Sequence, residues 1–422
     1  MRVFVKNMRG EALMPCSQRK ARILLRDCKA KIIIYSPFTI QLTIATGEAK
    51  QEISFGIDTG AKNIGIAVIT SNKVVFKAEI ELRQDIKELL ETRKIMRKSR
   101  RNRKTRYREA RFNNRGNKEE GWLPPSIESR IQNTFNWIDK ICDLIPNPKL
   151  NIEVGKFDVQ MMINPNIQGT DYQQGQGFGY YDVRHYVFAR DEYTCQICKK
   201  KEGILVQHHI IRRRDGGSDR ADNLVTLHDK CHEMFHQGKV RADFKKLKQY
   251  KEPPFMNSIR KRICKRYPEA KVCYGSFTKP KRIELGLEKT HYNDAIAISN
   301  PSCIRENWNE YLKIKQFRKK KRSLHESIPR KGHKVKNIVQ KRNKKNTKSV
   351  GEWNLGDKVL FDSKIGFLTG FTGKKGAYIK SINDEYLTLS GKNYKQVPLK
   401  SLSLINHNNN WLIENQKERS VK

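Results

Sequence analysis

The sequence predicts a multidomain α+β protein, and three observations support this expectation. The chain has 422 residues, enough for two or three domains, and 37% of them are hydrophobic, which is adequate for their cores. Short apolar runs typical of strands are interspersed with segments whose apolar residues recur at helical spacing. One segment, residues 195–236, places nearly every polar residue at a spacing that metal chemistry requires.

The excess of positive charge narrows the class of partner. The chain has 86 Lys and Arg residues against 44 Asp and Glu residues, a net charge of +42. Such a chain attracts polyanions, and its binding should weaken with salt as counterions are released. Ribosomal proteins share this balance, so the charge indicates nucleic acid and no particular activity.

The number of cysteines and the first residues of the chain indicate where in the cell the protein is located. The number of cysteines is nine, an odd number, and most of them are scattered without a pattern, which favours a reducing, intracellular setting. The start of the chain lacks the apolar segment of a signal peptide, and no apolar run approaches the length of a membrane span. We therefore expect a cytoplasmic protein with no membrane partner.

Residues 1–50 predict a compact basic α+β unit. Strands are expected at 2–6, 31–35 and 38–43, and a helix at 18–28. The pattern suits a small capping domain without a ligand of its own equally well.

The next segment predicts three strands and a candidate metal-binding carboxylate. Residues 52–81 form three strand-like runs, and the first run ends at Asp58, which is followed by Thr59 and Gly60. An acidic residue at the end of a buried strand, beside a glycine that lets a phosphate approach, is a good place for a metal ligand. Sugar kinases and actin-like ATPases open on similar strands, so an ATPase remains an alternative.

A strongly basic segment follows. Residues 92–115 carry a basic residue at about every second position and a single acid, Glu109, with no Pro or Gly before Gly116. Charge runs are usually solvated, but a helix that is basic on all sides has no apolar stripe to pack. We therefore expect one long helix that binds nucleic acid.

Two further segments supply acidic residues. A helix at 127–145 leads into a short strand that carries Glu153, and a Gln-, Gly- and Tyr-rich linker at 160–185 follows. Much later, His291 and Asp294 lie three residues apart on an expected helix, so they point the same way. A surface histidine and an acid favoured by the helix dipole are the alternative.

The segment at 195–236 contains an outer set of soft ligands. Cys195 and Cys198 form a C-x-x-C pair, and His228 with Cys231 forms an H-x-x-C pair about thirty residues later. This is the spacing of a tetrahedral structural zinc site.

An inner set of polar residues lies between and beside these ligands. A strand with His208 and His209, a loop through 216–217, Asn223, and a helix with His232 predict a ββα hairpin around one hard divalent cation. A purely structural zinc finger is the alternative, and His236 could take the place of His232 or His228.

The tail divides into two parts. Residues 316–348 are almost wholly Lys, Arg, Asn and Ser, a composition typical of segments that order only when nucleic acid neutralises them. Residues 352–413 contain five short strand-like runs with Gly-rich turns, which predict a small barrel or SH3-like sheet.

The histidine and asparagine pattern on a zinc-bound hairpin resembles the HNH endonuclease family. The resemblance implies that His209 is the general base that activates water against a phosphodiester. It also implies that His208 and His232 bind a Mg²⁺-type ion and that Asn223 orients the base. An imidazole suits the role of base because its ordinary pKa of about 6.5 leaves it neutral at working pH.

The strand that ends at Asp58 resembles the first strands of RuvC and other RNase H-like nucleases. Asp58, Glu153 and Asp294 occur in the order expected for a RuvC site split into three pieces. The resemblance implies that these carboxylates bind two Mg²⁺ ions and that His291 is the accompanying base or ligand.

The order of all these motifs resembles IscB, a compact transposon-encoded family of RNA-guided nucleases. The N-terminal P-L-M-P motif of that family reads Ala12-Leu13-Met14-Pro15 here. The resemblance implies one chain bound to one guide RNA (ωRNA) and cleavage of double-stranded DNA, with HNH cutting the guide-paired strand and RuvC the displaced one. It implies a split RNase H-like (RuvC) core, an inserted ββα-metal HNH module, an Arg-rich bridge helix and a small β-rich C-terminal domain.

The corresponding division of the chain is 1–50 (PLMP-type domain), 51–91, 121–160 and 246–305 (RuvC parts), 92–120 (bridge helix), 161–245 (linker and HNH), 306–350 (basic linker) and 351–422 (C-terminal RNA and target-adjacent-motif domain). Two alternatives are a guide-independent HNH homing-type endonuclease and a non-catalytic RNA-binding protein. The second leaves the acidic and histidine residues without a role.

Overall fold

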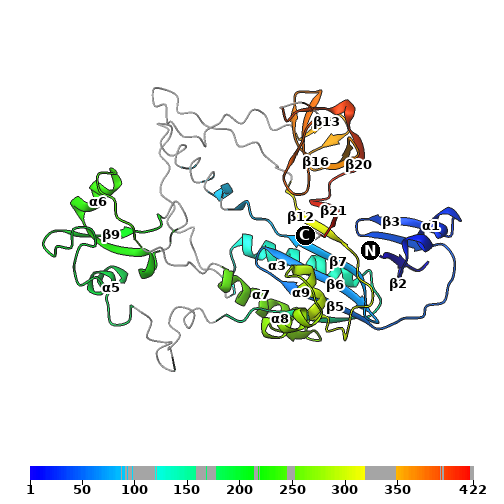
Figure 1. Cartoon of the computed structure of the whole chain (residues 1–422), viewed down its shortest axis with the longest axis horizontal. Coiled ribbons are helices and arrows are strands. Elements are labelled where there is room, and N and C mark those ends of the chain that lie inside the picture. Colours follow the sequence, from blue (N-terminus) through cyan, green and yellow to red (C-terminus); the bar gives the residue numbers. More distant parts are fainter. Residues whose placement is uncertain are drawn as a thin grey trace. The chain divides into compact units, whose positions relative to one another are not determined.

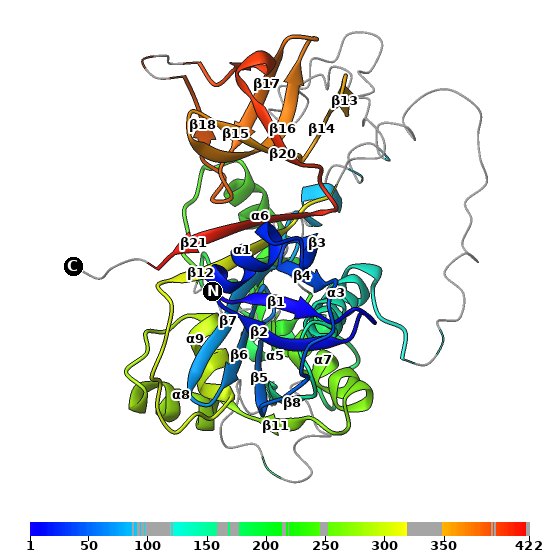
Figure 2. The same ribbon diagram turned by 90° about the vertical axis from the view of Figure 1, so that its right-hand side faces the viewer.

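The computed structural model divides the chain into two compact units, and the second is inserted in the sequence of the first (Figures 1 and 2). Unit 1 comprises Met1–Lys156 and Phe255–Lys422, and unit 2 comprises Phe157–Pro254. The structure describes residues 1–86, 88–90, 93, 97, 119, 121–157, 168, 177–212, 217, 219–244, 252–318, 348–389, 391 and 394–418. Nearly all of the expected basic helix at 92–115 and of the basic tail at 316–348 lies outside these residues.

Unit 1 is built on a seven-stranded mixed sheet in the order β11-β8-β5-β6-β7-β12-β21. Its strands are β5 (Ile53–Thr59), β6 (Asn63–Thr70), β7 (Lys73–Glu81), β8 (Pro148–Glu153), β11 (Lys271–Cys273), β12 (Glu310–Gln316) and β21 (Trp411–Lys417). β5, β6 and β7 form an antiparallel meander, whereas β8 runs parallel to β5 and β11 parallel to β8. The three strands expected in residues 52–81 are therefore confirmed.

Helices cover both faces of this sheet. The side chains of Phe55 and Ile57 belong to the main core together with apolar residues of α3 (Pro125–Cys142) and α7 (Glu252–Arg266). The alternate residues of β5 point to the other face. There α9 (His291–Ile298) packs on β5, β6 and β7, and α8 (Gly275–Glu284) packs against α9.

Two glycines let α9 lie directly on the backbone of the sheet. A Cβ atom on Gly56 would stand 1.9 Å from the carbonyl oxygen of Ala295, and one on Gly65 would stand 1.8 Å from that of His291. Both positions are occupied by helix backbone, which cannot move as a side chain can. The glycines thus set the height of the N-terminal end of α9 above the strand that carries Asp58.

Replacing Gly65 by alanine should displace α9. We expect the substitution to lower the free energy of unfolding by about 3 kcal/mol, since an added carbon in a tightly packed place costs roughly 1 to 3 kcal/mol or more. Denaturant unfolding of unit 1 measures this loss. Gly47→Ala is the control, because nothing lies within 4 Å of a Cβ there. Equal stability of the two variants would contradict the role given to Gly65.

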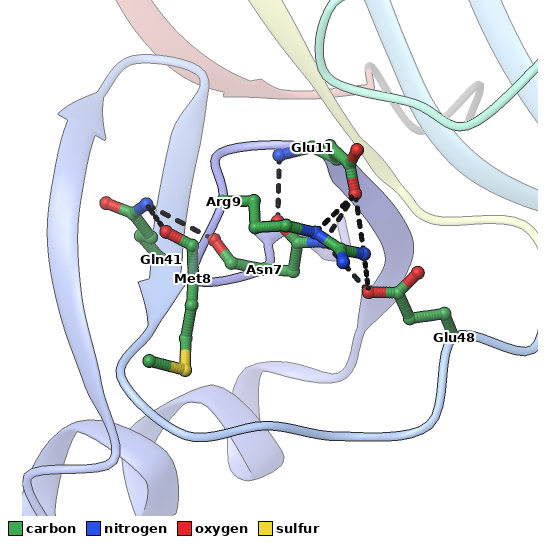
Figure 3. A network of polar contacts seen from close by, with 6 residues as sticks. All are labelled: Asn7, Met8, Arg9, Glu11, Gln41 and Glu48. Atoms are coloured by element: carbon green, nitrogen blue, oxygen red, sulfur yellow. Dashed lines mark hydrogen bonds and ion pairs between the residues drawn. The ribbon is translucent and has the colours of Figure 1, made fainter.

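The first fifty residues form the small α+β unit that the sequence predicts. The sheet order is β2-β1-β4-β3, from the strands β1 (Val3–Lys6), β2 (Ala12–Cys16), β3 (Ala30–Tyr35) and β4 (Phe38–Leu42), with α1 (Gln18–Arg26) following β2. A polar network fixes the turn between β1 and β2 (Figure 3). The side-chain amide of the buried Asn7 donates hydrogen bonds to the carboxylates of Glu11 and Glu48, and Arg9 forms ion pairs with both carboxylates.

The C-terminal part forms a separate small sheet, as expected. Its strands are β15 (Lys358–Phe361), β16 (Lys364–Thr372), β17 (Gly376–Lys380), β18 (Tyr386–Leu387), β19 (Val397–Pro398) and β20 (Ser403–Asn406), in the order β18-β17-β16-β15-β20 with β19 beside β17. A short hairpin of β13 (Ser349–Val350) and β14 (Trp353–Asn354) precedes it.

Two strands of the main sheet come from segments that the sequence assigned to other parts of the protein. β12 falls in the expected basic linker at 306–350, and β21 falls in the expected C-terminal domain, yet they pair with each other and β12 pairs with β7. The reason is the burial of Leu312, Ile314 and Ile413 against the core. β12 and β21 thus belong to the main sheet, and the domain boundaries at 306 and 351 stay predictions.

Unit 2 contains the expected strand and helix of a ββα hairpin. β9 (Leu205–His209) pairs antiparallel with β10 (Leu224–His228), and α6 (Asp229–His236) follows β10 directly. A single 3-10 turn (Ala221–Asn223) precedes β10, and α5 (Val183–Arg190) packs on both strands. Among the residues that the structure describes, no helix is long and apolar enough to cross a membrane.

Candidate nuclease sites

The four outer ligands of unit 2 converge as the spacing predicts. Ligand atoms of Cys195, Cys198, His228 and Cys231 all lie within 4.8 Å of one another, and the Cys198 sulfur is 3.2 Å from Nδ1 of His228. The tight turn is closed by hydrogen bonds from the Lys199 amide to Cys195 and from the Cys195 amide to Lys200. Three free sulfurs and one imidazole, largely buried, fit a structural Zn²⁺ ion.

Removal of zinc should unfold unit 2 and spare unit 1. The core of unit 2 is small and includes two of the ligands themselves, Cys195 and Cys231, so we expect Cys195→Ser to abolish its cooperative unfolding transition. Limited proteolysis and zinc content measure the effect. Cys264→Ser, an exposed thiol on α7, is the control. A protease-resistant, zinc-free unit 2 would contradict the assignment.

Three imidazoles form a second group. The ring nitrogens of His208, His232 and His236 lie within 4.8 Å of one another, and Nε2 of His232 is 3.0 Å from Nε2 of His236. Burial, together with the two neighbouring histidines, lowers the pKa of His208 to about 4, and burial also lowers the pKa of His232. Neutral imidazoles at pH 7 offer lone pairs to a divalent ion. The group contains no carboxylate, so its donors suit a transition ion better than Mg²⁺.

His209 lies outside this group, next to an acidic residue. Consecutive residues of a strand point to opposite sides: His208 is buried, whereas His209 is partly exposed and its Nε2 is 2.8 Å from Oδ1 of Asp219. A hydrogen bond from Nε2 to the carboxylate leaves Nδ1 as the unprotonated nitrogen of the neutral ring. That arrangement suits a general base.

Asn223 fixes the backbone that follows β9. Its side chain accepts a hydrogen bond from the Ile211 amide and donates one to the Ile211 carbonyl, both at 2.9 Å. These two bonds hold the chain just beyond the strand end that carries His209. The expected role of Asn223 in orienting His209 stays a prediction, and it would act through this backbone.

The comparisons with known proteins agree with this geometry. The HNH endonuclease family model matches residues 195–238. The chain carries an HNH endonuclease domain. The RRXRR protein family model matches residues 3–175, and with the HNH match it supports an HNH nuclease similar to the IscB type. The substrate class is therefore nucleic acid, and the HNH domain needs a divalent metal.

A curated relative covers a short part of the chain. The chain is 32% identical over 53 residues to anaredoxin of Nostoc sp. (strain PCC 7120), a match that spans 13% of this chain and 70% of that protein. Over that stretch the chain belongs to the same family as anaredoxin. The match says nothing of the rest of the sequence.

The structure also gathers predicted site residues outside the HNH domain, and most of them are acidic. Asp58 on β5 and Glu153 on β8 are direct neighbours in the parallel register, and Asp294 and His291 lie in the first turn of α9. Nδ1 of His291 is 2.6 Å from Oδ2 of Asp58. Three chain segments thus bring four predicted site residues to the same end of the sheet.

Each of the three acids has its own protein partner. Asp58 pairs with His291, Glu153 accepts a hydrogen bond from the buried Thr278 hydroxyl, and Oδ1 of Asp294 is 2.7 Å from Nε of Arg282. In the described part of the chain, two groups of side chains have ligand atoms within 4.8 Å of one another, namely the zinc ligands and the three imidazoles. The three acids do not form a third such group. The carboxylates lie close together but face different partners.

Burial has the largest effect on the pKa values of two of these acids, Glu153 and Asp294. Burial and the charges of Asp58 and Asp294 raise the pKa of Glu153 to about 7, and burial raises the pKa of Asp294. The hydrogen bond to Asp58 raises the pKa of His291. Ionisation of several neighbouring, partly buried carboxylates is unfavourable unless a cation lies beside them.

The sequence did not predict several residues of these sites. Asp219, Thr278 and Arg282 have no motif of their own. His236 was an open alternative, although its spacing of four from His232 on one helix indicates a shared face. Glu79 is a further acid: it pairs with Gly65, which pairs with Asp58, and burial raises its pKa.

Proposed function

We propose that the chain is an RNA-guided DNA endonuclease that cuts both strands of a duplex in the cytoplasm. The HNH domain would hydrolyse the guide-paired strand, and the acidic residues of unit 1, as a RuvC-type site, the displaced strand. The observation that carries the proposal is the convergence of Asp58, Glu153 and Asp294 at one end of the sheet. The HNH domain is inserted between the segments that supply the second and third of these acids.

The acidic residues fit hard divalent ions. Carboxylate oxygens are the ligands that Mg²⁺ prefers, and burial raises the pKa of Glu153 to about 7, so its ionised form is unfavourable without a cation beside it. Asp58, Glu153 and Asp294 would hold Mg²⁺, which would stabilise negative charge on the phosphate and the leaving oxygen. The hydrogen bond to Asp58 raises the pKa of His291, which favours the role of proton donor over that of base.

In the HNH domain, His209 would take the proton from the attacking water. Asp219 would hold the ring in the correct tautomer, and His208, His232 and His236 would hold the divalent ion. Because His208 and His209 point to opposite sides of β9, the scissile phosphate would lie at the end of the strand, where it can meet both.

The proposed guide RNA rests on charge and on the family match. A net charge of +42 suits a long polyanion, and the RRXRR match over residues 3–175 suggests association with RNA. One chain would bind one RNA, and base pairing would select the DNA strand.

The test is purification of the full chain together with any RNA that it binds in its native cells. RNA that copurifies is sequenced, and a duplex matched to its variable end is labelled separately on each strand. We expect cutting of both strands that requires a divalent ion and disappears after RNase treatment. Specific cutting by RNA-free protein would favour a guide-independent HNH endonuclease and overturn the proposed RNA guidance.

A further inference from the structure

Arg282 is held inside the acidic site by two contacts. It lies on α8, its side chain is 12% exposed, and its Nε atom is 2.7 Å from Oδ1 of Asp294. One terminal nitrogen donates to the carbonyl of Leu287 at 3.1 Å. The guanidinium is therefore anchored at one end by backbone and turned with the other toward the carboxylate.

Arg282 differs from the partners of the other two acids. Thr278 is neutral, and the charge of His291 depends on pH, whereas a guanidinium is always protonated. Of these three partners, Arg282 is thus the permanent cation. The ion pair with Arg282 also turns Asp294 toward α8. In the described part of the chain, the carboxylate oxygens of the three acids do not all lie within 4.8 Å of one another.

We propose that Arg282 is an internal counter-cation that holds Asp294 until divalent ions bind and then contacts the scissile phosphate. The inference rests on the proposed RuvC-type site. A planar guanidinium binds carboxylate and phosphate oxygens with the same geometry, so one anchored side chain can exchange Asp294 for a phosphate oxygen. Arg282 would compete with the metal for Asp294 and assist the reaction once it is released.

These two roles give effects of opposite sign. Arg282→Gln removes the competitor, so Mn²⁺ should bind roughly tenfold more tightly, because the metal no longer has to break the largely buried ion pair between Arg282 and Asp294. The same variant should cut the displaced strand roughly 100-fold more slowly at saturating metal, because a donor to the phosphate is lost. An arginine that only supports the fold would weaken both properties together.

The experiment uses the full chain with its RNA. Mn²⁺ binding is measured by calorimetry in a background with His232→Ala and His236→Ala, which removes the imidazole group, and displaced-strand cutting is measured separately with the HNH ligands intact. Lys279→Gln, an exposed cation on the same helix, is the matched control. Arg282→Met, which also removes the charge, replaces Arg282→Gln if the latter does not fold, with the same signs expected.

If Arg282→Gln binds Mn²⁺ as the wild type does or more weakly, Arg282 is not a counter-cation of Asp294. If Arg282→Gln cuts the displaced strand at the wild-type rate, Arg282 does not contact the scissile phosphate. Failure of the proposed function is distinguishable, since the wild-type complex would then leave the displaced strand uncut. The comparison of Mn²⁺ binding still decides the first half of the inference.

Discussion

His209→Ala is expected to slow cutting of the guide-paired strand by roughly 100- to 10,000-fold, the range for loss of a general base. Cutting of the displaced strand should keep its wild-type rate, because its proposed residues all belong to unit 1. The metal ligands remain, since His209 is not a member of the imidazole group. Single-turnover assays on a strand-labelled duplex measure both rates.

Two further variants make this result specific. His185→Ala removes an exposed histidine on α5 that pairs with Asp182, so it should cut both strands normally. Asp219→Asn keeps the shape but loses the charge that fixes the tautomer of His209, so it should cut the guide-paired strand slowly and the displaced strand normally. If His209→Ala cuts both strands at full rate, the base lies elsewhere.

The sites closest in sequence were the most predictable. The zinc ligands come as two pairs whose members lie three residues apart, so their spacing alone indicates which atoms can meet, and all four converge. His208 and His232 meet for a similar reason, because β9, β10 and α6 are consecutive. Asp219 escaped prediction because it lies in a loop, where no periodicity relates it to His209.

The residues that depend on long-range pairing were less predictable. Asp58 and Glu153 are neighbours only because β8 inserts beside β5 in parallel, and the resemblance, not the spacing, suggested it. β12 was assigned to a linker because lysines alternate with its buried Leu312 and Ile314 in a basic region. Arg282 is one of 86 basic residues, and composition cannot single it out.

Asp58→Asn tests the second site, and we expect at least a 100-fold slower cut of the displaced strand, roughly the effect of several kcal/mol of metal stabilisation. Asparagine keeps the shape of the side chain but removes one of three grouped negative charges. The hydrogen bond that raises the pKa of His291 weakens as well, so His291 holds its proton less firmly. The fold should survive, because the change relieves repulsion from Glu153 and Asp294.

A supercoiled plasmid with a matched target reads out this prediction in one assay. The wild-type complex should give linear DNA, whereas Asp58→Asn should give nicked circles, because the HNH domain continues to cut its own strand. Asp85→Asn is the control, since this acid pairs with Arg83 in the same unit and stands nearly half exposed. Linear DNA from Asp58→Asn would mean that the acids grouped around α9 do not hydrolyse DNA. Nicked circles from both Asp58→Asn and His209→Ala, cut on opposite strands, would place one nuclease site in each unit of the chain.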